Sequence, residues 1–325
     1  MTSDERGRTE SSERVRGPTP RRPPRSRDLD QLLREQRLVI ADVIAGAAPG
    51  TRRLFLADRE PKTVGAAVGL AHGAGGEEAI ANEVRVLAIL DEKLQGRLNA
   101  SVPHVVEWVD GPGGKRGLVV TAVPGLASVG APPPPSTTVP RDHFVAVVAW
   151  LAEVWSATAG EPTQVELGRS AVDQVLSRYR GAAHVRPAIG ALLRARGRLA
   201  QVQVPAAMTH GCLCARHVFV QNGEVGVDDW GLGRSDSDPL RDLGRYAVDA
   251  TGLRLAEVVA GRTKFAGSVK ATMQGALDSL TVPVRLWRDV LLLAQFEVAL
   301  TELAHGDAGR LAVLQQAVHA MPARP

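Results

Sequence analysis

The sequence predicts an α+β protein with two lobes, a small lobe built on antiparallel strands and a larger helical lobe. Strand-like runs are concentrated in the first third of the chain, and helix signals dominate from Asp142 onward. One short strand-like hairpin interrupts the helical part within residues 206–233. A chain of 325 residues is long enough for two domains or for one bilobal domain.

β-Branched runs on either side of turn-like sequences mark the strands. Two antiparallel hairpins are predicted in the first lobe, 51–57 with 64–71 across DREPK, and 105–109 with 118–123 across DGPGGK. A third hairpin, in the helical part, is predicted from the short runs that flank QNGE, 218–220 and 225–227.

Helices are predicted where apolar residues recur at spacings of three and four. The predicted ranges are 29–40 (with Asp28 or Asp30 as its cap), 77–94 (with Ile80, Val84, Leu87 and Ala88 on one face), 144–157, 163–179, 186–200, 284–304 and 309–320. Three tryptophans occupy apolar helix positions and are expected in the core, namely Trp150, Trp155 and Trp287. The proline-rich stretch 131–140 is expected to be a linker or surface loop, because four successive prolines donate no backbone hydrogen bonds.

The formal charge of +4 lies mostly in residues 1–28, which hold eight arginines and five acids, so the rest of the chain carries about +1. This stretch is predicted to be a disordered basic tail, and nucleic acid is disfavoured as a partner. No run of apolar residues is long enough to span a bilayer, and the N-terminus lacks the apolar region of a secretory signal. We therefore expect a cytoplasmic protein without a membrane partner. Cys212 and Cys214 are expected to be reduced thiols, because a disulfide between them would be strained.

Residues 208–244 contain three motifs in a fixed order. They are His210, Gly211 and Leu213; then Asp229, Trp230 and Gly231; then Asp238, Pro239, Asp242 and Leu243. In order and spacing they resemble the catalytic core of the aminoglycoside phosphotransferases and choline kinases, which have a bilobal protein-kinase-like fold. The resemblance implies a first lobe at 29–117, a hinge at 118–126 and a helical second lobe at 127–325.

The resemblance extends more weakly over about 60–250. Glu83 stands where the family's first-lobe helix carries the glutamate that pairs with a strand lysine, and residues 144–155 resemble the first long helix of the second lobe. The resemblance implies ATP and Mg²⁺ as cofactors and a reaction driven by positioning and charge neutralisation. It assigns Asp229 to the metal, His210 to the catalytic loop, and Glu83, Asp229 and His217 to cofactor binding.

Several positions depart from the family pattern. Cys212 stands at the position of the catalytic aspartate, and His217 at that of the metal-binding asparagine. The strand lysine is absent, since Gly69 or a neighbour occupies its position and the nearest lysine is Lys62. The only candidate phosphate loop is AGAAPG at 45–50, which lacks the family's glycine pattern. A thiol supplies no fixed carboxylate at neutral pH, and an imidazole is a poor ligand for Mg²⁺.

These losses favour a catalytically degenerate, pseudokinase-type binding or partner protein, for instance in a biosynthetic pathway, with affinity for ATP and Mg²⁺ weakened or lost. The alternative is an active ATP-dependent phosphotransferase acting on a hydroxyl of a small molecule or peptide. A third hypothesis is a metal- or thiol-dependent function at residues 210–217, where two histidines and two cysteines lie within eight residues.

Five acidic residues have further expected roles. Asp242 is expected to hold the catalytic loop through backbone hydrogen bonds, and Asp228 to face away from Asp229. Asp236 and Asp238 are expected near the mouth of the cleft between the lobes. Glu83, without its lysine, is expected to be exposed or paired with an arginine.

Overall fold

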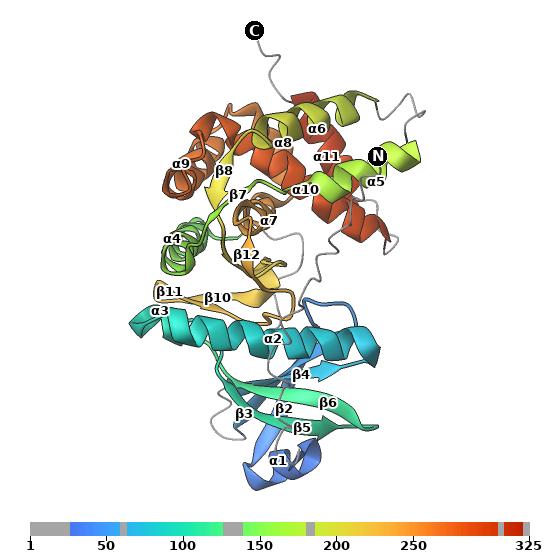
Figure 1. The fold of residues 1–325 in the computed structure, drawn as a ribbon, viewed down its shortest axis with the longest axis vertical. Coiled ribbons are helices and arrows are strands. Elements are labelled where there is room, and N and C mark those ends of the chain that lie inside the picture. Colours follow the sequence, from blue (N-terminus) through green and yellow to red (C-terminus); the bar gives the residue numbers. More distant parts are fainter. Residues whose placement is uncertain (1–26, 59–63, 126–138, 180–185, 305–308, 321–325) are drawn as a thin grey trace, which may run out of the picture.

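The computed structural model describes residues 27–320 except 59–63, 126–138, 180–185 and 305–308. The chain forms a small lobe built on one sheet and a larger, mostly helical lobe (Figure 1), as predicted. The predicted linker 131–140 lies mostly outside the described residues, as does the tail up to residue 26. Arg27 and Asp28 form a two-residue strand, so at these two positions the structure differs from the predicted tail.

The small lobe contains a six-stranded sheet of order β1-β5-β6-β4-β3-β2. Its strands are β1 (Arg27–Asp28), β2 (Leu38–Ala45), β3 (Thr51–Asp58), β4 (Val64–Ala71), β5 (Val105–Gly111) and β6 (Lys115–Thr121). Both predicted hairpins are confirmed as the antiparallel pairs β3–β4 and β5–β6. Helix α1 (Leu29–Glu35) buries leucines on one sheet face, and α2 (Gly73–Lys93) lies between the sheet and the large lobe (Figure 1).

The predicted helix at 29–40 is wrong in its second half. The Asp28 side chain caps α1 by accepting a hydrogen bond from the backbone N–H of Gln31 at 3.1 Å, as expected. The helix then ends, because Arg37 takes a left-handed conformation with φ 56°. The residues that follow form β2 at the sheet edge, where they pair with β3. The β-branched run that continues from Leu38 thus favours the strand over a longer helix.

Helix α2 begins four residues earlier than predicted, and its buried face is rotated. Ile80 and Leu87 are buried as expected, but Ala88 is exposed. Glu83 is only 2% exposed and belongs to the buried face, which otherwise holds apolar side chains. A carboxylate buried in this way needs a partner.

The large lobe is predominantly helical, with short strand pairs next to the small lobe (Figure 1). Its helices are α4 (Arg141–Thr158), α5 (Arg169–Tyr179), α6 (Arg186–Leu199), α7 (Leu240–Thr251), α8 (Leu255–Ala260), α9 (Lys264–Ser279), α10 (Trp287–Ala304) and α11 (Gly309–Ala320). Its strands are β7 (Pro162–Gln164), β8 (Gln203–Pro205), β9 (Ala207–Thr209), β10 (Val218–Gln221), β11 (Glu224–Val227) and β12 (Arg234–Ser237). Four of the five predicted helices and the β10–β11 hairpin are confirmed. The helix predicted at 163–179 is wrong in its first six residues, because Pro162–Gln164 form β7 and pair with β8, and α5 begins only at Arg169, after Gly168 with φ 75°. Helices α7, α8 and α9 were not predicted.

A short helix, α3 (Gly96–Ala100), follows α2 and lies against α4 of the large lobe. Ser101, just after α3, accepts a hydrogen bond from the indole of Trp150 on α4 at 2.7 Å, and its carbonyl accepts one from the backbone N–H of Val227 at 2.9 Å. Trp150, Trp155 and Trp287 are all buried, as predicted. No helix among the described residues has the length and hydrophobicity needed to cross a membrane.

Candidate functional site

An arginine that the sequence analysis did not single out lies at the centre of the junction between the lobes. Arg53 on β3 is 1% exposed. Its Nε donates to Asp228 Oδ2 at 2.8 Å, and its Nη2 donates to the other oxygen of the same carboxylate. Its Nη1 lies 3.1 Å from Glu83 Oε1. Burial lowers the pKa of Arg53, but Asp228 and Glu83 raise it by more, so the guanidinium stays charged.

Arg53 lies next to the part of β4 that the sequence analysis aligned with the family's strand lysine. Gly69, one of the residues aligned with that lysine, lies directly opposite Arg53 in the β3–β4 register. A Cβ added to Gly69 would lie 3.0 Å from Arg53 Nη1 and 3.6 Å from Glu83 Oε2. The cation that pairs with the helix glutamate therefore comes from the neighbouring strand. Lys62 lies outside the described residues.

Glu83 was expected to be either exposed or paired with an arginine. The structure shows the second arrangement, since Glu83 is buried and pairs with Arg53. Besides Arg53, it contacts the backbone N–H of Trp230, which donates to Glu83 Oε1 at 3.4 Å. Burial raises the pKa of Glu83 to about 7, with further contributions from Asp229 and Asp228, although Arg53 opposes the shift.

Asp228 and Asp229 point to different partners, as expected for adjacent residues. Asp228 binds Arg53, whereas Asp229 Oδ2 accepts a hydrogen bond from the backbone N–H of Ala47 at 2.7 Å and lies 3.9 Å from His217 Nδ1. Asp229 has the unusual φ of 65°. Burial opposes ionisation of Asp229, but His217 and Arg53 outweigh it, so its pKa lies below the usual range.

The candidate phosphate loop at 45–50 connects β2 to β3 and lies against Asp229. Besides the Ala47 contact, the carbonyl of Gly50 accepts a hydrogen bond from the backbone N–H of His72 at 2.7 Å. Gly50 has φ 78°, and a Cβ there would lie 2.8 Å from the His72 carbonyl oxygen. The backbone N–H of Ala47 in this loop thus donates to the Asp229 carboxylate.

Asp242 holds the loop after β9, which confirms the role predicted for it. Its carboxylate accepts the backbone N–H groups of His210 at 2.5 Å and Gly211 at 3.0 Å. His210 is 1% exposed, and its Nε2 lies 2.8 Å from the carbonyl oxygen of Asp228. Its ring lies 5.0 Å from the Trp230 ring, centroid to centroid. His210, which belongs to the first motif, thus contacts Trp230 of the second motif and Asp228, the residue just before that motif.

Cys212, Cys214 and His217 form a hydrogen-bonded cluster next to Asp229. Both cysteines are free and buried. A side-chain hydrogen bond with Cys214, together with burial, raises the pKa of Cys212 well above its usual range. The same bond lowers the pKa of Cys214 despite burial, with help from His217 and Arg245. Burial lowers the pKa of His217, but Cys214 and Asp229 raise it by more.

The donor set does not fit a magnesium site. Mg²⁺ prefers oxygen ligands in octahedral geometry, but Asp229 has one oxygen bound to Ala47 and an imidazole as its neighbour. Among the described residues, no group of three or more His, Cys, Asp and Glu side chains could hold a metal ion. Zinc at residues 210–217 is also disfavoured, because both ring nitrogens of His210 already have partners in the protein. Its Nδ1 accepts the backbone N–H of Cys212 at 3.3 Å, and its Nε2 is bound to the backbone carbonyl of Asp228.

Asp238 does not lie at the mouth of the cleft, contrary to the expectation. It is 3% exposed and accepts backbone N–H groups from Glu166 at 2.9 Å, Leu167 at 3.0 Å and Leu240 at 2.9 Å. Its carboxylate thus holds the first residue of α7 and the segment before α5. Asp236 is exposed, and one of its oxygens accepts a hydrogen bond from the Ser235 hydroxyl.

Solved structures of phosphotransferases share this fold. The GDP complex of aminoglycoside 2'-phosphotransferase-IIIa is 15% identical with a TM-score of 0.53, over 89% of this chain and 97% of that one. The macrolide 2'-phosphotransferase MphH from Brachybacterium faecium is 20% identical with a TM-score of 0.50, over 90% and 98%. A mutant of aminoglycoside phosphotransferase APH(4)-Ia with AMP-PNP and hygromycin B is 14% identical with a TM-score of 0.51, over 90% and 97%.

These matches establish the protein-kinase-like fold of the aminoglycoside and macrolide phosphotransferases, which the sequence predicted. No model of a protein family matches the sequence, and no curated protein matches it. The function must therefore be argued from the residues of the site.

Proposed function

We propose that this chain is a catalytically degenerate protein of the phosphotransferase fold that acts as a binding or partner protein. The observation that carries the proposal is the buried thiol of Cys212, which the sequence motifs align with the catalytic carboxylate of the fold family. This thiol is hydrogen-bonded to Cys214 and has a raised pKa, so it holds its proton at neutral pH. A positioned general base contributes about 10²–10⁴-fold to a rate, and that contribution is missing.

The charges of the site support the same conclusion. Phosphoryl transfer depends on positive charge placed around the phosphates. Arg53 is the buried cation of the network, and the carboxylates of Asp228 and Glu83 already surround it. No surplus positive charge therefore remains in this network for a nucleotide.

The contact between Ala47 and Asp229 supports the proposal independently. A backbone N–H in a glycine-containing loop is a good donor to a phosphate oxygen. Here the N–H of Ala47 binds the very carboxylate to which the fold family would assign the metal. Nucleotide and metal would both have to displace this hydrogen bond, so we expect affinity for ATP with Mg²⁺ to be weak or absent.

A second candidate function is an active ATP-dependent phosphotransferase that modifies a hydroxyl of a small molecule or peptide. The observation that favours it is the ion pair of Arg53 with Glu83, which rebuilds the cation–glutamate pair of the family from another strand. The structural neighbours crystallised with GDP or AMP-PNP make both guanine and adenine nucleotides reasonable donors to test.

Thermal unfolding with millimolar ATP or GTP and Mg²⁺ tests the choice. A ligand at 100 times its Kd stabilises the native state by about 2.7 kcal/mol, which is easily measured. We expect no shift in Tm and no release of phosphate. A shift that Asp229→Asn abolishes, together with turnover of nucleotide, would instead establish the second function.

A further inference from the structure

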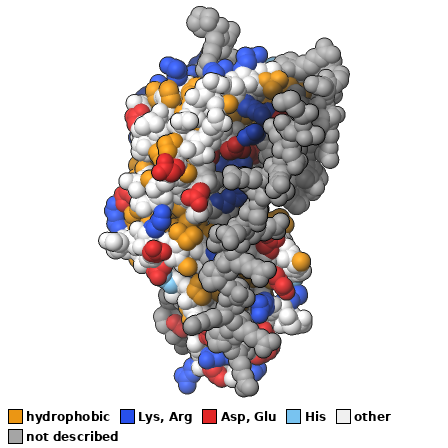
Figure 2. Space-filling model, in the orientation of Figure 1, with side chains coloured by type: hydrophobic (Ala, Val, Ile, Leu, Met, Phe, Trp, Pro, Cys, Tyr) orange, Lys and Arg blue, Asp and Glu red, His pale blue; other side chains and the backbone are white. Residues whose placement is uncertain are grey.

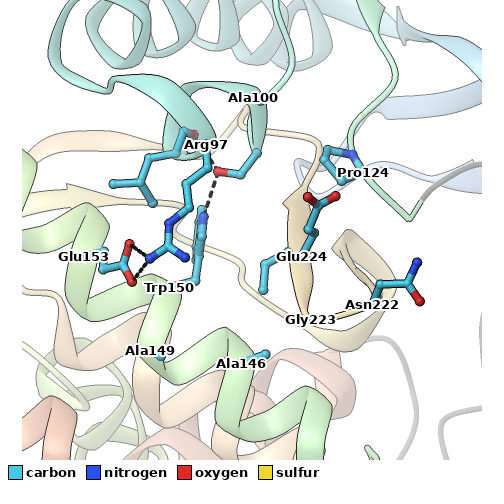
Figure 3. Close-up of a pocket in the computed structure, with 13 residues that line it drawn as sticks. Arg97, Ala100, Pro124, Ala146, Ala149, Trp150, Glu153, Asn222, Gly223 and Glu224 are labelled. Atoms are coloured by element: carbon cyan, nitrogen blue, oxygen red, sulfur yellow. Dashed lines mark hydrogen bonds and ion pairs between the residues drawn. The ribbon is translucent and has the colours of Figure 1, made fainter.

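A pocket lies where α3, the segment after β6, α4 and the turn between β10 and β11 meet (Figure 3). Its volume is about 430 Å³, within the usual range for small-molecule sites. None of its lining residues belongs to the network of Arg53, Glu83, Asp228 and Asp229. It is therefore a separate feature of the lobe junction.

The walls of this pocket are largely apolar and firmly held. They include Leu98 from α3, Pro124 from the hinge, Ala146 from α4 and Val225 from β11. The indole N–H of Trp150 is already bound to the Ser101 hydroxyl, which itself donates to the carbonyl of Leu98 at 2.6 Å. Because these polar groups are satisfied within the protein, the ring of Trp150 offers a fixed apolar wall to a ligand.

The charged groups of the pocket sum to a net negative charge. Arg97 (+1) donates to both oxygens of Glu153 (−1) at 2.5 and 2.6 Å, which leaves Glu224 (−1) unbalanced, a total of −1. Figure 3 shows Glu224 and Glu153 on opposite sides of Trp150. Among the residues that the structure describes, Glu224 has no hydrogen-bond or ion-pair partner for its carboxylate.

The position of Glu224 is fixed by the hairpin that carries it. Asn222 and Gly223 both have positive φ, 52° and 81°, which is the geometry of a tight two-residue turn. Glu224 directly follows this turn and pairs with Gln221 in the β10–β11 ladder. The carboxylate is thus presented at the edge of the pocket from a rigid element.

We propose that this pocket binds a small organic cation with an apolar body, whose ammonium group pairs with Glu224. The apolar body packs against Leu98, Ala146 and Val225, and the ammonium remains near solvent at the rim. Such a ligand touches α3 of the small lobe and α4 of the large lobe together, so its binding also stabilises the junction. The proposal does not depend on whether the chain transfers phosphate.

Two probes of the same shape and opposite charge test the ligand class. We expect 2-phenylethylammonium to bind in the millimolar range by saturation-transfer NMR and calorimetry, and 3-phenylpropionate to give no signal. Glu224→Gln removes only the charge and is expected to weaken binding roughly fivefold, the scale of a solvent-exposed ion pair. Glu78→Gln, an exposed glutamate on α2 outside the pocket, changes the net charge equally and should leave binding unchanged.

A filling variant tests the location. Ala149 lines the pocket and is exposed, so Ala149→Trp should block the space while the fold is kept, as a thermal melt would verify. We expect this variant to lose the ammonium signal. Equal binding of both probes, no binding of the ammonium probe, or full binding by Glu224→Gln or Ala149→Trp would each overturn the proposal.

Discussion

Arg53 lies directly opposite Gly69 in the β3–β4 pair, and its guanidinium fills the space that a side chain at Gly69 would need. The guanidinium of Arg53 can therefore lie here only because Gly69 has no side chain. A cation still faces Glu83, but it comes from β3 and is also bound to Asp228 of the large lobe. Arg53 therefore connects α2 of the small lobe to the segment after β11 of the large lobe.

This arrangement predicts a strong coupling between positions 53 and 69. Gly69→Lys alone places an ammonium beside the Arg53 guanidinium with a Cβ only 3.0 Å from Nη1, so it should be destabilising. In the double variant Arg53→Leu with Gly69→Lys, the lysine can pair with Glu83 and should recover part of the loss. Urea unfolding of the four proteins should give a coupling energy of roughly 1–3 kcal/mol.

The matched control is Gly65→Lys on the same strand. Gly65 is exposed, and a Cβ there meets nothing within 4 Å, so its effect should simply add to that of Arg53→Leu. If Gly69→Lys were equally additive, Arg53 and Gly69 would be independent, and the exchange of the cation between strands would be disproved.

Removal of Arg53 should be among the most damaging single substitutions in the small lobe. Arg53→Met leaves the buried carboxylates of Asp228 and Glu83 facing each other without a cation. Breaking a buried ion pair in this way costs about 3–5 kcal/mol, measured by denaturant unfolding. Arg169→Met removes an exposed pair with Glu166 and should cost at most about 1 kcal/mol. Similar losses for the two variants would mean that Arg53 contributes no more than a surface ion pair.

The sequence located the motifs of the site because their order along the chain is preserved. It did not locate Arg53, because the family pattern directs attention to β4 alone. The hairpin that holds Arg53 and Gly69 was predicted, but its residue-by-residue register, which places the two residues opposite each other, was not. The pairing of Glu83 with an arginine could be anticipated, but which arginine pairs with it could not.

Two errors of local structure have physical causes of the same kind. The run from Leu38 was assigned to a helix, but the sheet edge beside β3 offered it hydrogen-bonding partners that a local pattern does not reveal. The predicted buried face of α2 did not include Glu83, because a carboxylate is expected on the surface unless a buried partner such as Arg53 is known. Both errors arise where tertiary contacts override local preference.

Asp242 is predicted to be essential for the order of the loop that carries Cys212. Asp242→Ala leaves the buried backbone N–H of His210 and the partly buried one of Gly211 without acceptors, at about 1–3 kcal/mol for the buried group and less for the other. We expect a lower denaturant midpoint and faster hydrogen exchange at these two amides. Asp236→Ala, an exposed aspartate nearby, should change stability by no more than about 0.5 kcal/mol. Unchanged exchange at His210 would show that Asp242 does not hold the loop.

Glu83 should make the protein less stable as the pH rises from about 4.5 to about 7. Burial raises its folded-state pKa to about 7, whereas an unfolded glutamate has its pKa near 4.5. In this window the folded state keeps a proton that the unfolded state has released, so the free energy of unfolding falls with pH. The slope can reach about 1.4 kcal/mol per pH unit for one proton.

The comparison that isolates this contribution is Glu83→Gln against the unaltered protein, by denaturant unfolding at several pH values. Other groups titrate in the same range, including His217 with its raised pKa, and they contribute equally to both proteins. Glu83→Gln should therefore shift the slope of the unfolding free energy against pH toward more positive values between about 4.5 and 7, because it removes a contribution that falls with pH. Glu78→Gln, exposed on the same helix, should keep the original slope. An unchanged slope in Glu83→Gln, or one shifted toward negative values, would mean that Glu83 takes up no extra proton on folding in this range.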